Sequence, residues 1–172
     1  GRQTHKMELP PGGCYNLKNG PLLEVGRMRI PMKVDYGVRA LVELALHYGE
    51  GHVQTSEIAA KQGIPEPYLE QLMTTLHKYG FVRSRRGPQG GHALAMEPSA
   101  VNLGMVMTTL EGNTSPLDCF TYPNDCIFSE NCAQQEVWKS VEDSIQSVLT
   151  NTTLAHLAQR QSYLSGQGMY QI

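Results

Sequence analysis

Three cysteine side chains lie close together in the second half of the chain. Cys119, Cys126 and Cys132 are separated by six and then five residues, whereas Cys14 stands alone near the start. Thiolates that converge from one short segment can bind zinc or an iron–sulfur cluster. The opening segment lacks the apolar core of a secretory signal, so we expect a cytoplasmic protein, in which clustered thiols favour a metal site over a disulfide framework. The spacing alone leaves iron–sulfur, zinc and free or disulfide-bonded thiols open.

A second chemical feature is a group of basic side chains in the first half. The net charge is −2, yet residues 28–98 hold 8 Lys and Arg against 7 Asp and Glu, and residues 101–172 hold 2 against 7. Binding to DNA requires a local positive face, because the phosphate contacts govern counterion release. The basic residues that cluster with no acid between them are Lys78, Arg83, Arg85 and Arg86.

The arginines of this group lie on a glycine-rich turn. Residues 81–84 and 92–95 have the composition of two short strands, and residues 85–91 between them form a basic turn. Glycine lets a backbone approach DNA closely, and arginine enters the minor groove where it is narrow and most negative. A solvated basic turn is the alternative. The residues that we assign to DNA binding here are Arg85, Arg86, Gly87, Gly90 and Gly91.

Three helices are expected to carry this hairpin. From Val38, apolar residues repeat at helical spacing until Gly49. Residues 55–62 begin with capping residues and end at Gly63, and Pro65 and Pro67 then open another helix. Two short helices joined by a glycine-containing turn are typical of a helix-turn-helix, and a hairpin that follows directly is a wing.

The second helix of this pair offers polar side chains for reading bases. Glu70 can accept from cytosine N4 and Gln71 can pair with adenine, and we assign both, together with Tyr68, to DNA binding. An ordinary solvated helix face is the alternative interpretation.

The second half of the chain indicates a dimer. A helix is expected over residues 101–111, then the cysteine segment, then a long helix over residues 133–149 and a short closing helix at 152–157. A single long helix with one narrow apolar seam usually needs a partner. The seam comprises Val137, Val141, Ile145 and Val148, flanked by Trp138.

These elements predict a mainly α fold with a small β-hairpin wing, that is, a winged helix-turn-helix plus a long dimerisation helix. The expected division is an N-terminal extension or cloning remnant (1–27), the DNA-binding domain (28–100), a linking helix with the cysteine segment (101–132), the dimerisation and closing helices (133–164) and a tail (165–172). No apolar run approaches the roughly 20 residues that span a bilayer, so we expect no membrane association.

The order of several segments resembles the IscR/NsrR-type family of winged-helix regulators. The similarity runs from residue 28 to about residue 161 and rests on residues 35–41, 68–72, 86–91, 110–112 and 152–154 together with the cysteines. The resemblance implies a homodimer, a pseudo-palindromic operator on double-stranded DNA, and a [2Fe–2S] or [4Fe–4S] cluster on three cysteines. It also implies that Glu70 and Gln71 contact bases and that Arg86 is the wing arginine.

The sequence departs from the family pattern at two places. No histidine follows Cys132 to serve as a fourth ligand, and His92 stands where an aromatic residue is usual. By resemblance to NsrR-like members, Asp35 of the opposite subunit supplies the fourth ligand; the alternative is that Asp35 caps the first helix. Other candidate carboxylates are Asp118, Asp125, Glu130 and Glu136.

The leading hypothesis is therefore a homodimeric DNA-binding sensor of iron, redox or nitric oxide status. One alternative is a metal-independent regulator switched by a protein partner, and another is a zinc-bound form of the same regulator. A small iron–sulfur electron carrier would leave the helix-turn-helix without a purpose. Enzyme activity is not expected, because no sequence context arranges a catalytic triad or a nucleotide-binding loop.

Overall fold

The helix-turn-helix and the helix that precedes it lie in the first half of the chain in the computed structural model, which describes residues 30–112, 120, 122 and 132–167. They are α1 (Met32–Leu46), α2 (Thr55–Gln62) and α3 (Glu66–Lys78). Helix α2 ends where Gly63 takes φ 63°, and the Gly63 N–H bonds to the Ala59 carbonyl, as expected for a glycine that stops a helix. Helix α3 carries proline in its first turn, where no backbone hydrogen bond is lost.

Helix α1 begins six residues before the predicted start at Val38. The first turn buries Val34, and the next position that faces the core is Gly37, at the crossing with the helix α4 (Leu103–Glu111). A Cβ at Gly37 would meet the Leu110 side chain at 2.6 Å. The position is therefore buried but small, and hydrophobic periodicity does not detect it.

The wing is a two-stranded antiparallel sheet of β1 (Val82–Arg85) and β2 (Gly91–Leu94). The register pairs Val82 with Leu94 and Arg85 with Gly91. Strand β1 begins one residue later than predicted, because buried Phe81 still belongs to the turn after α3: its N–H bonds to the Leu76 carbonyl at 3.0 Å. Strand β2 begins one residue earlier than predicted, because Gly91 pairs with Arg85.

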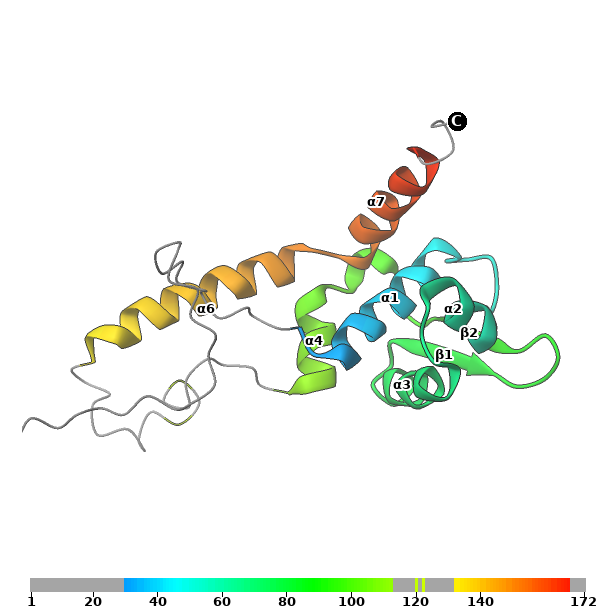
Figure 1. The fold of residues 1–172 in the computed structure, drawn as a ribbon, viewed down its shortest axis with the longest axis horizontal. Coiled ribbons are helices and arrows are strands. Elements are labelled where there is room, and N and C mark those ends of the chain that lie inside the picture. The colour runs from blue at the N-terminus through cyan, green and yellow to red at the C-terminus, as the bar shows by residue number, and fades with distance from the viewer. Residues whose placement is uncertain (1–29, 113–119, 121, 123–131, 168–172) are drawn as a thin grey trace, which may run out of the picture.

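The core lies between α1, α2, α3, the base of the wing, α4 and the first turn of α7 (Leu154–Gln167) (Figure 1). A 3-10 turn (Pro98–Ala100) leads from the wing to α4. The chain returns to this core after α6 (Ala133–Asn151), where the Leu154 N–H bonds to the Val101 carbonyl at 2.9 Å. The largest side chains that are fully buried include Leu41, Leu44, Ile58, Leu69, Met73, Leu76 and Leu154.

Helix α6 extends away from this body as an arm (Figure 1). None of its residues is buried among the described part of the chain. Helix α7 is longer than predicted and includes the start of the expected tail; the Thr153 side chain accepts from the His156 N–H at its first turn. The predicted mainly α fold with a hairpin wing is confirmed. None of the described helices is long and apolar enough to cross a bilayer.

Candidate nucleic-acid interface and metal ligands

Helix α3 buries one face and exposes the side chains that were assigned to base reading. Its buried residues lie on the core face, whereas Glu70 and Gln71 are exposed. The hydroxyls of Thr74 and Thr75 donate to the carbonyls of Glu70 and Gln71 at 2.9 and 3.2 Å. Within the described residues, the side chains of Glu70 and Gln71 make no hydrogen bond, so both can meet a base edge.

Tyr68 is half-buried and anchors α3 against α1. Its ring packs edge-on against the ring of Tyr36, with centroids 5.7 Å apart and an interplanar angle of 80°. The Arg39 guanidinium lies 5.8 Å from the Tyr36 ring centroid and donates to the Gln62 carbonyl at 3.4 Å. Tyr68 therefore holds the recognition helix in place, and part of its surface remains open beside a hollow that it lines with Lys33 and Gln71.

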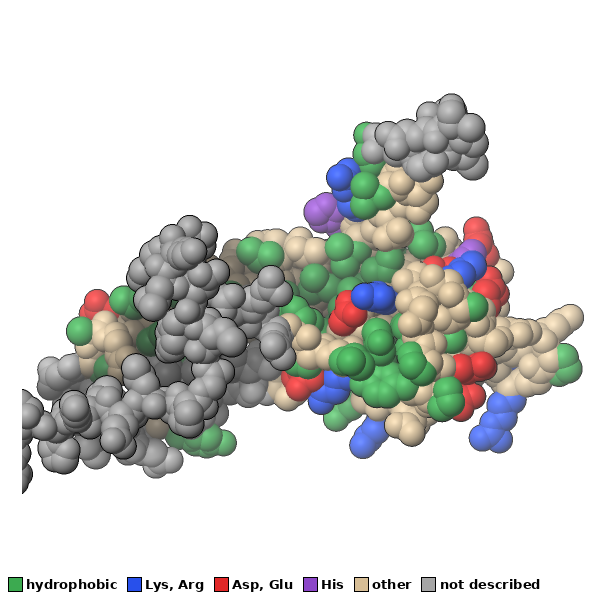
Figure 2. Space-filling view, viewed as in Figure 1, with side chains coloured by type: hydrophobic (Ala, Val, Ile, Leu, Met, Phe, Trp, Pro, Cys, Tyr) green, Lys and Arg blue, Asp and Glu red, His purple; other side chains and the backbone are tan. Residues whose placement is uncertain are grey.

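The wing presents Arg85 and Arg86 on an exposed turn. Both side chains are exposed, and Gly87 and Gly91 adopt φ values of 111° and 140°, which side-chain-bearing residues rarely adopt. Gly90 is buried, and a Cβ there would overlap the carbonyl oxygen of Arg85. The glycines are thus required by the turn itself. Figure 2 shows Lys and Arg side chains projecting along the edge of the body that carries α3 and the wing.

Only part of the predicted metal site lies in the described residues. Cys132 is half-buried, carries a free thiol and forms the N-cap position of α6, where the helix dipole favours an anionic side chain. Cys119 and Cys126 lie outside the described residues, as do the alternative carboxylates Asp118, Asp125 and Glu130. Within residues 30–112 and 132–167, no group of three His, Cys, Asp or Glu side chains is placed to hold a metal ion.

Asp35 lies inside the first turn of α1 and not before it. The helix begins after Pro31, without a side-chain cap, so the interpretation of Asp35 as the capping residue is wrong. Its carboxylate pairs with the Arg39 guanidinium instead, at 2.9 and 3.2 Å. Both side chains are more than two-fifths exposed. A surface pair of this kind is weak, so the carboxylate could exchange Arg39 for another partner.

A buried carboxylate that the sequence did not single out joins α1 to α2. Glu43 is 4% exposed and accepts from Lys61 Nζ at 3.0 Å and from Gln62 Nε2 at 2.9 Å. Burial raises the pKa of Glu43, but the two hydrogen bonds and the charges of Lys61 and His47 outweigh it and hold the pKa below its ordinary value. The sequence does contain a signal for this buried carboxylate, because an acidic residue stands between Val42 and Leu44 on an apolar face of the helix.

His92 is the second residue that sequence reasoning missed. The sequence marked it only as a departure from the aromatic residue that is usual in the family. The structure instead places its ring between the wing and the first turn of α2, in contact with hydroxyls of Ser84 and Thr55.

Known proteins share this arrangement over most of the chain. A family model described as Rrf2, iron-dependent transcriptional regulator, matches residues 30–160. The HTH-type transcriptional regulator CymR of Bacillus subtilis is 37% identical over 140 residues, which cover 81% of this chain and 94% of CymR. The regulator IscR of Yersinia enterocolitica is 36% identical over 137 residues, covering 80% and 83%. The solved structure of CymR, titled the global cysteine regulator of B. subtilis, superposes with a TM-score of 0.69 at 36% identity, covering 78% of this chain and 98% of CymR.

A helix-turn-helix with a basic wing packed beside its recognition helix defines a winged-helix transcription regulator. The chain belongs to the Rrf2 family of transcriptional regulators. Because its relatives regulate transcription, the chain is a regulator and not an enzyme.

Proposed function

We propose that this protein is a cytoplasmic homodimer that binds a pseudo-palindromic operator and responds to iron, redox or nitric oxide status through an iron–sulfur cluster. The observation that carries the proposal is the co-occurrence, in one chain of the Rrf2 family, of exposed Glu70 and Gln71 on α3 and three closely spaced cysteines. Symmetric dimers match two-fold-related half-sites on DNA, so the exposed apolar seam of α6 supports the palindromic operator.

Cys119, Cys126 and Cys132 would hold the cluster, with Asp35 of the opposite subunit as the leading fourth ligand. The donor chemistry fits: Cys132 has a free thiol at a helix N-terminus, and Asp35 has an exposed carboxylate. A carboxylate binds iron more labilely than a thiolate does, so the cluster would supply an iron site open to exchange. These ligands are compatible with either a [2Fe–2S] or a [4Fe–4S] cluster.

Within this chain, the residues divide the work of DNA binding. Glu70 and Gln71 read base edges, with Tyr68 holding α3 against α1, while Arg85 and Arg86 contact the backbone and minor groove through the turn formed by Gly87, Gly90 and Gly91. Residues 113–132 connect α4, which packs on α1, to α6. Ligation of their cysteines would set how the two recognition helices of a dimer are placed, and release would change that placement and the DNA affinity.

The test is a visible spectrum of anaerobically purified protein, with iron and acid-labile sulfide measured on the same sample. We expect a chromophore with both elements present, and its loss in Cys132→Ala and in the same replacement of Cys119 or Cys126. Cys14→Ala is the matched control and should retain the chromophore. Protein that carries neither iron nor sulfide after anaerobic reconstitution would refute the cluster.

A metal-independent or zinc-bound regulator is the second candidate. The similarity to CymR favours this candidate, because CymR, which is described as a cysteine regulator, is as similar to this chain as IscR is. In that case a protein partner would act on the cysteine segment or on the acidic second half. Colourless protein with stoichiometric zinc, or without metal but fully active in DNA binding, would select this candidate.

A further inference from the structure

The wing is joined to the segment that precedes α2 by a set of hydrogen bonds. Val53 and His92 exchange two backbone bonds, Val53 N–H to the His92 carbonyl and His92 N–H to the Val53 carbonyl, each 2.8 Å. The Gln54 side chain donates to the Pro88 carbonyl in the turn at 3.3 Å. A Cβ at Gly91 would overlap the Val53 carbonyl oxygen, so the two backbones are in direct contact.

The side chain of His92 adds a second connection at the same place. Its Nδ1 lies 2.8 Å from Ser84 Oγ on β1, and its Nε2 lies 3.0 Å from Thr55 Oγ1 in the first turn of α2. Ser84 and His92 are paired across the hairpin, and Ser84 directly precedes Arg85. One imidazole therefore joins both strands of the wing to the helix-turn-helix.

The surroundings of the ring favour its neutral form. Burial lowers the pKa of His92, the neighbouring charges of His77 and His52 lower it further, and Glu70 opposes them. A neutral imidazole has one N–H and one acceptor nitrogen, so one hydroxyl accepts from the ring and the other donates to it.

We propose that His92 is a positioning residue for DNA binding, which fixes the wing arginines relative to the recognition helix by bridging Ser84 and Thr55. A phenylalanine side chain at this position could fill the same space, but it could not make either hydrogen bond. The proposal rests on the proposed wing–DNA contact of Arg85 and Arg86. Without the bridge, the backbone hydrogen bonds still hold the wing in its fold, but the wing samples more orientations. Its arginines are then in position to contact DNA for a smaller fraction of the time.

A double-mutant cycle on the whole chain tests the proposal. The variants are His92→Phe, the pair Arg85→Ala with Arg86→Ala, and all three substitutions together. Affinity is measured on a labelled mixed-sequence DNA duplex at low salt, because a wing contact acts on every sequence. Amide hydrogen exchange of residues 82–94 is measured in the free protein. Ser84→Ala and Thr55→Val each remove one hydrogen bond with little change in volume, and they replace His92→Phe if that variant does not fold.

We expect His92→Phe to weaken DNA binding by about tenfold in the wild-type background, from two neutral hydrogen bonds, and by less than twofold when the arginines are absent. Exchange in residues 82–94 should quicken, and Ser84→Ala and Thr55→Val should each show about half the effect on a logarithmic scale. An equal loss in both backgrounds, or unchanged exchange, would overturn the positioning role. If the arginine pair itself leaves affinity unchanged while exchange still quickens, the wing–DNA contact has failed and His92 serves the wing's structure alone.

Discussion

The most direct perturbation of the proposed dimer is to place charge in the apolar seam of α6. Val141 is 39% exposed and Ile145 is half-buried in the single chain, while Val137 and Val148 are 63% and 66% exposed. A helix that projects from the body with such a seam is marginal alone. At ~25 cal/mol/Å², covering the exposed part of one such side chain stabilises the dimer by about 1 kcal/mol.

The double substitution Val141→Lys with Ile145→Lys removes these contributions from both protomers. Four side chains correspond to about 4 kcal/mol, and each 1.4 kcal/mol changes a dissociation constant tenfold, so the dimer weakens by about three orders of magnitude. Close approach of the added ammonium groups weakens it further. We therefore expect a monomer at micromolar concentration, with DNA affinity reduced because only one half-site is bound at a time.

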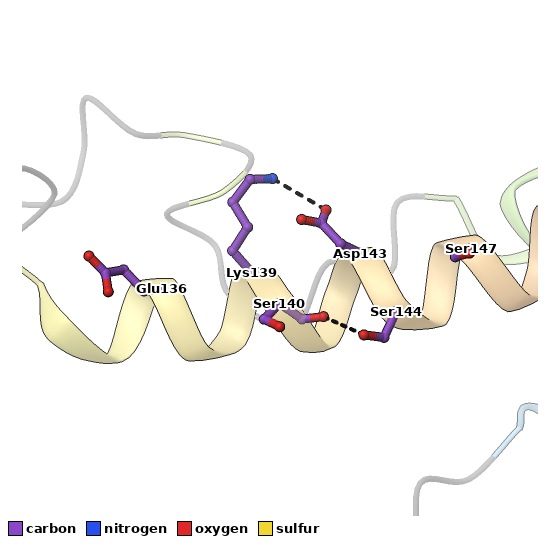
Figure 3. A pocket seen from close by; sticks show the side chains of 6 residues that line it. All are labelled: Glu136, Lys139, Ser140, Asp143, Ser144 and Ser147. Carbon is purple, nitrogen blue, oxygen red and sulfur yellow. Dashed lines mark hydrogen bonds and ion pairs between the residues drawn. The ribbon is translucent and has the colours of Figure 1, made fainter.

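Sedimentation velocity against concentration is the assay, with circular dichroism to confirm that α6 remains helical. The matched control is Ser140→Lys with Ser147→Lys, which adds the same charge on the polar side of α6. Both serines line the hollow of about 710 Å³ along that side, beside the Lys139–Asp143 ion pair (Figure 3). The control should remain dimeric. Wild-type protein that sediments as a monomer at micromolar concentration, or a valine–isoleucine variant that remains a dimer, would refute the reasoning.

Four further outcomes follow from the described contacts. Arg86→Ala should weaken binding to every DNA sequence and lower the salt slope by about 1, whereas Glu70→Ala should change base preference by about 1–3 kcal/mol at one position; competition binding at several salt concentrations separates them. Asp35→Ala should shorten the lifetime of the reconstituted chromophore while Asp143→Ala does not, and equal lifetimes would remove Asp35 from the ligand set. Glu43→Ala should lower the free energy of unfolding, measured in urea, by about 2 kcal/mol. Because folding lowers the pKa of Glu43, the extra stability of the wild type should be fully present above the ordinary carboxyl pKa and should disappear as pH falls through the lowered pKa. Gly91→Ala should slow DNA association without loss of helix, since the new Cβ would overlap the Val53 carbonyl; unchanged wing exchange would contradict that overlap.

Local chemistry explains which elements were predictable from sequence. Helix α2 matches its predicted bounds, and Gly63 ends it as expected. At the other end, the expected capping residues Thr55 and Ser56 lie inside the first turn, and the N-cap position is Gln54, which makes no side-chain cap hydrogen bond. Helix α1 and helix α7 were predicted too short, since periodicity weakens where Gly37 meets Leu110 and where α7 leaves the core after Ala158. Strand β1 begins one residue later than predicted because Phe81, although apolar, completes the turn after α3, and β2 begins one residue earlier because Gly91 pairs with Arg85.

The candidate site was predictable only where exposure follows from pattern. Glu70, Gln71, Arg85 and Arg86 are exposed as expected, because they lie off the apolar stripe or on a turn. Glu43 and His92 were missed, because their partners are 18 and 37 residues distant in sequence. Long-range polar pairs leave no period in a sequence, so only the folded chain identifies them.

The contacts around α3 indicate where a signal can act. On one flank, Tyr68 is held by Tyr36 of α1; on the other, the wing is bonded to residues 53–55 through His92. The recognition helix and wing therefore form one body in each protomer of the proposed dimer, and a switch that moved them apart would have to break the tyrosine contact and the hydrogen bonds of His92. A movement of this body in one protomer relative to the same body in the other protomer breaks none of these contacts. Such a movement depends on α4, residues 113–132 and α6. The proposed sensor cysteines lie in the segment between α4 and α6. We therefore expect signalling to change the spacing between the two DNA-binding domains of the dimer, each of which stays intact.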